Sequence, residues 1–345
     1  MTSVRDEVNS HFIVGRQARD TGAGESPAAG TSGDHGQIKG LPRDGPEVTD
    51  IAHLGGGVGA GLPAGDAAIA PHRAGRTTEE AEIPLHGGDM TEGVVRVGGT
   101  VRRPVRAHTA AVHALLRHLE AVGFEGAPRV LGIDAKNREI LTYLPGEVPR
   151  RPLPGYALAE STLVALAELQ RGYHQAVASF DPPSWACWDG ELTAQVDGPP
   201  DILCHCDINL ENVIFRDEPA GLRPYAFIDF DLARPGTRLV DIVQTLRYWA
   251  PIADPADRDP ALRDADAAAR TAVFCKAYGL SHVELARLVP VGSRWLRRSR
   301  ATIAGRARAR GGAWARMLDE GVGERLLRSA AWLEQNRRDI EAHLR

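Results

Sequence analysis

Two short segments of this 345-residue chain place acidic and amide side chains at the ends of apolar runs. The first, residues 202–215, reads ILCHCDINLENVIF, and the second, residues 225–231, reads YAFIDFD. The polar side chains that follow the apolar runs are His205, Asp207, Asn212, Asp229 and Asp231. Short apolar runs of this kind are typical of buried strands. The sequence therefore predicts two strands that deliver these side chains to one site.

The residue types suit the transfer of a phosphoryl group, a reaction that depends on positioning and on charge neutralisation by metal ions. The carboxylate of Asp229 and the amide oxygen of Asn212 are hard ligands of the kind that Mg²⁺ prefers. Asp207 is then free to accept the proton of an attacking hydroxyl. We interpret His205 as a residue that orients the loop presenting Asp207, with direct proton transfer as the alternative.

Together with Asp241 in the segment RLVDI, these motifs resemble the aminoglycoside/choline phosphotransferase family, whose first motif usually reads His-Gly-Asp-x-x-x-x-Asn. The resemblance covers residues 83–345 and implies an α+β, bilobal, protein-kinase-like fold. A small antiparallel-sheet lobe would precede a larger, mainly helical lobe. The implied reaction is an ATP- and Mg²⁺-dependent transfer to a hydroxyl of a small molecule. By the same resemblance, Asp207 is the catalytic base, Asn212 and Asp229 are metal ligands, and Asp241 is a buried acceptor that braces the catalytic loop.

Two positions depart from the family pattern. Cys206 stands where the family usually has glycine, and its Cβ would make a positive φ costly. Asp231 stands where many members have glycine. It is either a solvated loop acid, which we favour, or a residue that approaches a second metal ion.

The region before these motifs predicts a small nucleotide-binding sheet. Residues 94–97 and 100–104 read as a hairpin with a Gly-Gly turn, and the preceding loop contains Gly87 and Gly88. The loop resembles the glycine-rich turn that covers ATP phosphates in kinase-like folds. A phosphate-binding cation is expected on the next strand, where only Arg102 and Arg103 are available. Since alternation puts them on opposite faces, only one can enter the site, and we select Arg103.

Residues 107–122 predict a helix with an apolar stripe. In the family this helix commonly offers a glutamate to the strand cation, but its only acid here is Glu120, near the wrong end. The usual ion pair is therefore expected to be absent or replaced, and His113 is interpreted as a surface or packing residue. Residues 128–133 and 139–144 predict two further strands.

Pro145-Gly146 then breaks the strand pattern. In the resembling enzymes this break is the hinge between the lobes, and its backbone pairs with adenine. By position, Thr142 would supply the carbonyl and Leu144 the amide.

Composition sets the remaining expectations. Residues 1–82 are rich in Gly, Ala and Pro and predict a disordered extension, followed by a nucleotide-binding lobe (83–146) and a catalytic and substrate lobe (147–345). The net charge of −4, the scattered cysteines and the lack of a long apolar run favour a cytoplasmic protein with no membrane or nucleic-acid partner. Acidic residues between 250 and 267 are interpreted as helix caps, with attraction of a cationic acceptor as the alternative. Oligomeric state and acceptor are not encoded in any recognisable motif.

Two other functional classes compete with the kinase. A nucleotide-binding pseudoenzyme with a regulatory role is suggested by the missing helix glutamate and by Cys206. A zinc protein using Cys204, His205 and Cys206 is the third class. We expect alternate strand side chains to point to opposite faces, which would keep these three from one ion.

Overall fold

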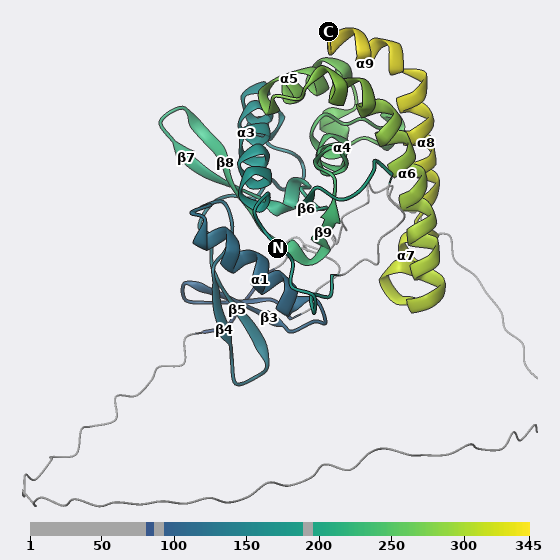
Figure 1. Cartoon of the computed structure of the whole chain (residues 1–345). Coiled ribbons are helices and arrows are strands. Elements are labelled where there is room, and N and C mark those ends of the chain that lie inside the picture. Colours follow the sequence, from purple (N-terminus) through teal and green to yellow (C-terminus); the bar gives the residue numbers. More distant parts are fainter. Residues whose placement is uncertain (1–80, 86–92, 189–195) are drawn as a thin grey trace, which may run out of the picture. The chain divides into compact units, whose positions relative to one another are not determined.

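The computed structural model of the chain describes residues 81–85, 93–188 and 196–345, which form a small lobe and a larger, mainly helical lobe (Figure 1). The small lobe holds an antiparallel sheet in the order β1-β2-β3-β5-β4 together with helix α1. Its elements are β1 Ile83–Pro84, β2 Val95–Val97, β3 Thr100–Pro104, α1 Thr109–Ala121, β4 Val130–Ile133 and β5 Arg138–Thr142. The α+β, bilobal fold expected from the sequence is confirmed.

The hairpin predicted around Gly98 and Gly99 is present. Val97 pairs with Thr100 across the turn, and Gly98 adopts a positive φ of 55° that a side chain would disfavour. Strand β3 pairs on its other edge with β5. The small lobe is therefore built from neighbouring antiparallel strands, as the spacing of the apolar runs predicted.

Helix α1 packs through the apolar stripe seen in the sequence. The stripe consists of Ala111, Val112, Leu115, Leu116 and Leu119, each at most 2% exposed. This spacing puts all five side chains on one face of the helix. Burial of this stripe therefore determines which face of α1 packs against the core.

The large lobe combines two short β-ribbons with helices. Its elements are α2 Gly155–Leu158, α3 Glu160–Val177, β6 Ile202–Cys204, β7 Val213–Glu218, β8 Gly221–Phe227, β9 Arg234–Gly236, α4 Arg238–Trp249, α5 Ala267–Tyr278, α6 His282–Arg310, α7 Gly312–Asp319, α8 Val322–Gln335 and α9 Arg337–His343. β6 pairs with β9 and β7 with β8, each antiparallel. Ala159, with an extended ψ of 145°, separates α2 from α3.

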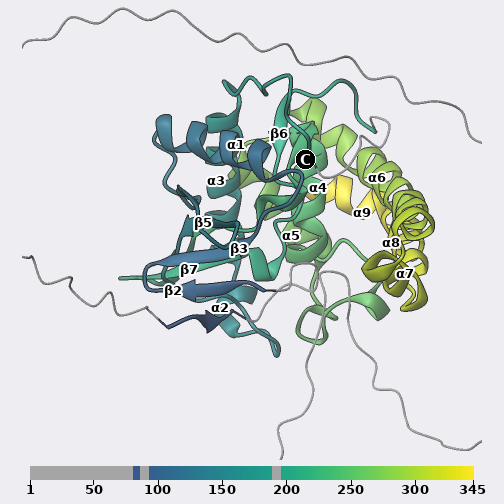
Figure 2. The ribbon, with the colours of Figure 1, turned by 90° about the horizontal axis from the view of Figure 1, so that it is seen from below.

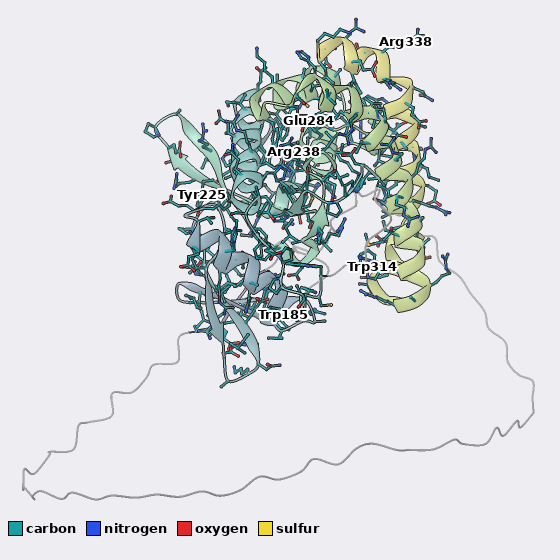
Figure 3. All side chains as sticks on the ribbon, viewed as in Figure 1. Trp185, Tyr225, Arg238, Glu284, Trp314 and Arg338 are labelled. Carbon is teal, nitrogen blue, oxygen red and sulfur yellow. The ribbon has the colours of Figure 1, made fainter. Side chains whose placement is uncertain are left out.

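One apolar core runs through the described residues from α1 to α9. Its largest fully buried side chains include Trp249, Tyr173 and Phe215. Helices α6 and α8 lie side by side in two perpendicular views and form the outer layer of the large lobe (Figures 1 and 2). Arg238 of α4 donates from Nε to Glu284 Oε1 of α6 at 2.7 Å, and both side chains are labelled in Figure 3.

The acidic segment between α4 and α5 caps helices. Asp254, Asp259 and Asp266 each accept a hydrogen bond from the backbone N–H of a residue in the turn that follows them. These contacts satisfy donors that a helix start leaves unpaired. The capping interpretation is therefore confirmed for these three residues.

No helix in the described part of the chain combines the length and the apolar character that a membrane span requires.

Candidate active site

Asp207 lies in the loop after β6 and is held by two amide side chains. Asn209 Nδ2 donates to its Oδ1 at 3.1 Å, and Asn212 Nδ2 donates to its Oδ2 at 2.8 Å. Asn212 Nδ2 also donates to the Asp207 backbone carbonyl at 2.9 Å. Because the amide nitrogen of Asn212 faces Asp207, the Asn212 Oδ1 is the atom of this side chain that could bind a cation. The carboxylate of Asp207 is thus fixed in place beside a neutral oxygen ligand.

His205 is fully buried and contacts backbone on both sides. The Asp207 N–H donates to Nδ1 at 3.2 Å, and Nε2 donates to the Ile228 carbonyl at 3.1 Å. Burial lowers the pKa of His205, although the charges of Asp241 and Asp229 oppose that shift. A neutral ring with both nitrogens bonded to backbone is suited to orienting the loop, which supports the orienting role over proton transfer.

Asp241, in the first turn of α4, accepts hydrogen bonds from the same loop. The Cys206 N–H donates to Oδ1 at 2.8 Å, while the His205 N–H donates to Oδ2 at 3.2 Å. The ring of His174 contacts Oδ2 through Nε2 at 2.9 Å, and Gln170 Nε2 lies 3.4 Å from the same oxygen. Burial alone would raise the pKa of Asp241, but the hydrogen bond and charge of His174 outweigh it and lower the pKa. Asp241 therefore stays ionised and holds the loop to α4.

Cys206 adopts the positive φ of 65° that its family counterpart glycine would adopt freely. The sulfurs of Cys204 and Cys206 and a carboxylate oxygen of Asp241 lie within 4.8 Å of one another. His205 is not part of this group, because both of its ring nitrogens contact backbone elsewhere. The expectation that Cys204, His205 and Cys206 do not meet at one ion agrees with these contacts, although Asp241 stands where the histidine was considered.

This cluster nevertheless remains a poor zinc site. Burial raises the pKa of the Cys204 thiol well above its ordinary value, and its hydrogen bond with Cys206 and the charge of Asp241 add to the shift. Metal ions bind the thiolate, which is disfavoured here. The Asp241 oxygens also already accept hydrogen bonds from the loop and from His174.

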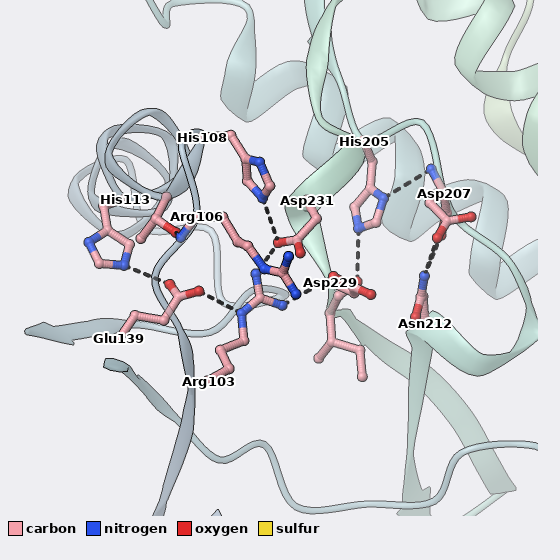
Figure 4. A network of polar contacts seen from close by, with 12 residues as sticks. Arg103, Arg106, His108, His113, Glu139, His205, Asp207, Asn212, Asp229 and Asp231 are labelled. Atoms are coloured by element: carbon pink, nitrogen blue, oxygen red, sulfur yellow. Dashed lines mark hydrogen bonds and ion pairs between the residues drawn. The ribbon is translucent and has the colours of Figure 1, made fainter. Parts of the chain in front are cut away.

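Asp229 follows β8 and also has a left-handed backbone, with φ 61° and ψ 68°. The preceding residue, Ile228, donates its N–H to the Asn212 carbonyl at 3.0 Å, so the two motifs lie against each other (Figure 4). A carboxylate from Asp229 and an amide oxygen from Asn212 form an oxygen-only donor set, which fits Mg²⁺. The backbone contact brings the segment of Asp229 next to the segment of Asp207 and Asn212, and the roles of the three residues as base and metal ligands stay predictions.

Arg103 reaches this site from the small lobe. Its Nη1 donates to Asp229 Oδ1 at 3.1 Å, and its Nη2 contacts Asp231 Oδ1 (Figure 4). Arg102 lies on the other face of β3, where its Nε donates to Thr100 Oγ1 at 3.2 Å. Asp231 is therefore not the solvated loop acid that we favoured, because the guanidinium crosses between the lobes to meet it. The negative charges around Arg103 raise the pKa of its guanidinium, more than reversing the effect of burial.

The expected helix acid is replaced by Glu139 of β5, a residue that the sequence argument missed. Glu139 is fully buried, and its Oε1 accepts from Arg103 Nε at 2.6 Å. His113 of α1 contacts the other carboxylate oxygen through Nε2 at 2.7 Å. Glu139 lies directly opposite Arg103 in the β3–β5 register, so correct pairing of the two predicted strands would have found it.

Of the other residues expected to contact the nucleotide, Thr142 and Leu144 lie in the described part of the chain. Thr142 ends β5, and its hydroxyl accepts from the Arg129 N–H at 2.8 Å, while Leu144 lies in the connection that follows. Gly87 and Gly88 lie outside the described residues.

Comparisons with known proteins agree with this geometry. Residues 175–274 match the model of the phosphotransferase enzyme family, APH. Over 165 residues the chain is 34% identical to the trifolitoxin immunity protein of Rhizobium leguminosarum bv. trifolii, an alignment that covers 47% of this chain and 60% of that protein. An ADP-bound aminoglycoside phosphotransferase superposes with a TM-score of 0.50 at 15% identity, covering 74% of this chain and 95% of that one.

A GDP complex of an aminoglycoside 2'-phosphotransferase mutant also gives a TM-score of 0.50, at 14% identity, with 76% of this chain and 93% of that one covered. These two structures show the shared fold, and the family match contains the whole segment from His205 to Asp241. Residues 175–274 therefore resemble the phosphotransferase enzyme family, and the described part of the chain has the α+β, bilobal fold of the two solved phosphotransferases.

Proposed function

We propose that this protein is a phosphotransferase that moves the γ-phosphoryl group of ATP to a hydroxyl of a small molecule. The observation that carries the proposal is the amide-held carboxylate of Asp207 beside Asn212 and Asp229, with Arg103 arriving from the other lobe. The match of residues 175–274 to the phosphotransferase family supports the same conclusion.

Each residue has a defined task in this proposal. Asp207 accepts the proton of the acceptor hydroxyl, and its two amide partners keep the carboxylate aimed at that hydroxyl. Mg²⁺ held by Asn212 and Asp229 would neutralise the charge of the transferring phosphoryl group. Arg103 binds phosphate oxygens through its guanidinium, which matches their geometry.

The nucleotide itself would be held by four further residues. Backbone amides at Gly87 and Gly88 would approach the phosphates, while the Thr142 carbonyl and the Leu144 amide would pair with adenine.

All four cysteines are free thiols, which is consistent with a reducing cytoplasm where ATP is plentiful. We propose no nucleic-acid or membrane partner.

The test is an ADP-release screen of the full-length protein over amino sugars, amino alcohols, nucleosides and macrolides. Asp207→Ala should lower turnover by about 10²–10⁴-fold, the usual contribution of a positioned base. Asp229→Ala should abolish Mg²⁺-dependent turnover. Asp217→Ala, which removes an exposed acid on β7, serves as the matched control and should leave turnover unchanged. Turnover that survives in Asp207→Ala would contradict the assigned base.

The pseudoenzyme remains the alternative, because Cys206 and the relocated acid depart from the family pattern. It predicts binding of ATP with no turnover above that of the Asp207→Ala protein. The weak background ATPase common in such sites separates the two, since only an active enzyme loses it on substitution of Asp207.

A protective function is a second candidate, favoured by the 34% identity to an immunity protein. In this case the acceptor would be a hydroxyl of a toxin. Expression in a sensitive strain should give resistance with the wild-type chain and none with Asp207→Ala. Equal resistance from both proteins would show that protection does not depend on phosphotransfer.

A further inference from the structure

The guanidinium of Arg103 is bound on three sides by acids, one from β5 and two from the turn that follows β8. Its Nε donates to Glu139 at 2.6 Å, its Nη1 donates to Asp229 at 3.1 Å, and its Nη2 contacts Asp231. Because Glu139 occupies Nε, both terminal nitrogens face the large lobe (Figure 4). This orientation presents the forked end of the guanidinium at the site, where Asp229 and Asp231 contact it. A phosphate group can be recognised by the same fork when it takes the place of one of these carboxylates.

Glu139 is itself held by α1. Its second carboxylate oxygen contacts His113 Nε2 at 2.7 Å, and the side chain of Glu139 is only 1% exposed. Burial would raise the pKa of Glu139, but the hydrogen bond from His113 and the charge of Arg103 lower it overall. The glutamate therefore stays ionised while both of its oxygens have fixed partners.

The first turn of α1 lies near the same group of charges. His108, the residue before α1, places Nε2 at 3.5 Å from Asp231 Oδ1. His113 and His108 thus both approach acids that contact the same guanidinium. The position of α1 relative to the large lobe is consequently linked to the orientation of Arg103 through side chains alone.

We propose that Glu139 and His113 are positioning residues for nucleotide binding, acting through Arg103 in place of a carboxylate on the helix. The inference rests on the proposed function, because it assumes that Arg103 receives nucleotide phosphates. In this arrangement the carboxylate that holds Arg103 comes from the neighbouring strand β5, and the histidine of α1 holds that carboxylate in place. A lysine could not replace Arg103 here, since one ammonium group cannot hold Glu139 on one side and offer a fork on the other.

The test measures binding of Mg·ADP and Mg·ATP to the full-length protein by calorimetry, which needs no acceptor. Glu139→Gln keeps the shape of the side chain and removes its charge. We expect it to weaken nucleotide binding by roughly tenfold or more, the effect of losing one buried charge-assisted hydrogen bond. Glu120→Gln neutralises an exposed acid on α1 and is the matched control, with affinity unchanged.

A double-mutant cycle separates positioning from general damage. In an Arg103→Met background, Glu139→Gln should change affinity by less than about twofold, because its partner is already gone. His113→Leu should weaken binding, while His113→Gln, which retains a donor for Glu139, should restore most of it. Melting temperatures of all variants report whether each one folds.

The outcomes distinguish the inference from the function on which it rests. If the wild-type protein binds neither nucleotide, both fail. If the wild type binds and Glu139→Gln binds equally well, or if the Glu139 effect persists undiminished without Arg103, the positioning role fails and the phosphotransferase proposal stands.

Discussion

At the scale of single residues, the site contains two left-handed positions occupied by side chains that normally avoid them. Cys206 has φ 65° and Asp229 has φ 61°. Such a conformation costs roughly 1–2 kcal/mol per residue for a non-glycine residue. At Cys206 the hydrogen bonds that Asp241 accepts from the loop amides hold the backbone in this conformation. Strain at these positions is therefore localised where the carboxylates of the proposed site are presented.

The strain at Cys206 gives a prediction about stability. Both Cys206→Ala and Cys206→Gly remove the buried sulfur, but only glycine also relieves the positive φ. We expect Cys206→Gly to be more stable than Cys206→Ala by about 1 kcal/mol in urea unfolding. The same pair at Cys275, inside α5, should show the opposite order by about 1 kcal/mol, because glycine is unfavourable in a helix. Equal stability of the two variants at position 206 would mean that the loop carries no such strain.

His205 gives a prediction about pH. Its pKa in the folded protein lies below the ordinary value of 6.5, chiefly because of burial. The unfolded chain therefore binds more protons at this residue as the pH falls below 6.5, and folding stability declines over that window. The contribution to the slope is at most about 1.4 kcal/mol per pH unit for one proton. His205→Gln should remove it from stability measured between pH 7 and 5, whereas the exposed His282→Gln should leave the slope unchanged.

At the scale of elements, the connection between the lobes is anchored to the large lobe. Glu147 and Phe215 exchange backbone hydrogen bonds of 2.9 and 2.7 Å. Tyr225, labelled in Figure 3, donates from its hydroxyl to the Pro145 carbonyl at 2.5 Å. Gly146 between them has φ 151°, and a Cβ there would lie 2.3 Å from the Phe215 carbonyl oxygen. The connection can approach β7 this closely only because residue 146 is glycine.

Gly146→Ala is accordingly expected to destabilise the fold by at least about 2 kcal/mol, from backbone strain and overlap with Phe215 together. Gly155→Ala is the matched control, since nothing lies within 4 Å of the added Cβ. It should be neutral or slightly stabilising, because it lowers the entropy of the unfolded chain. Comparable unfolding midpoints for the two variants would show that the connection moves aside at little cost.

The sequence predicted the strands and helices of the small lobe better than the contacts between them. Apolar runs and turns located β2 to β5, α1 and the two motif strands, because those signals are local. The role of Glu139 was not predicted, because its pairing with Arg103 depends on the register of β3 and β5 and not on spacing along the chain. The left-handed backbone at Cys206 could be inferred only from the glycine that the resembling family has at this position, because cysteine itself does not favour a positive φ.

At the scale of the whole molecule, the two lobes meet through charges that also form the proposed nucleotide site. In the described residues, Arg103 of the small lobe contacts Asp229 and Asp231 of the large lobe. A ligand that binds between these groups stabilises the folded chain by mass action, because the unfolded chain has no such site. Thermal unfolding therefore reports nucleotide binding without knowledge of the acceptor.

Saturation with Mg·ADP should consequently raise the melting temperature of the wild-type protein. At a nucleotide concentration 100-fold above Kd the gain is about 2.7 kcal/mol, which corresponds to roughly 4–5 °C for a chain of this size. Asp229→Asn should lose the part of the shift that EDTA removes from the wild type, because the asparagine no longer supplies an anionic ligand to Mg²⁺. Running Mg·GDP in parallel identifies the preferred base, since the proposed contacts of the base with Thr142 and Leu144 do not involve the metal. An undiminished Mg²⁺-dependent shift in Asp229→Asn would place the metal elsewhere and remove Asp229 from the proposed site.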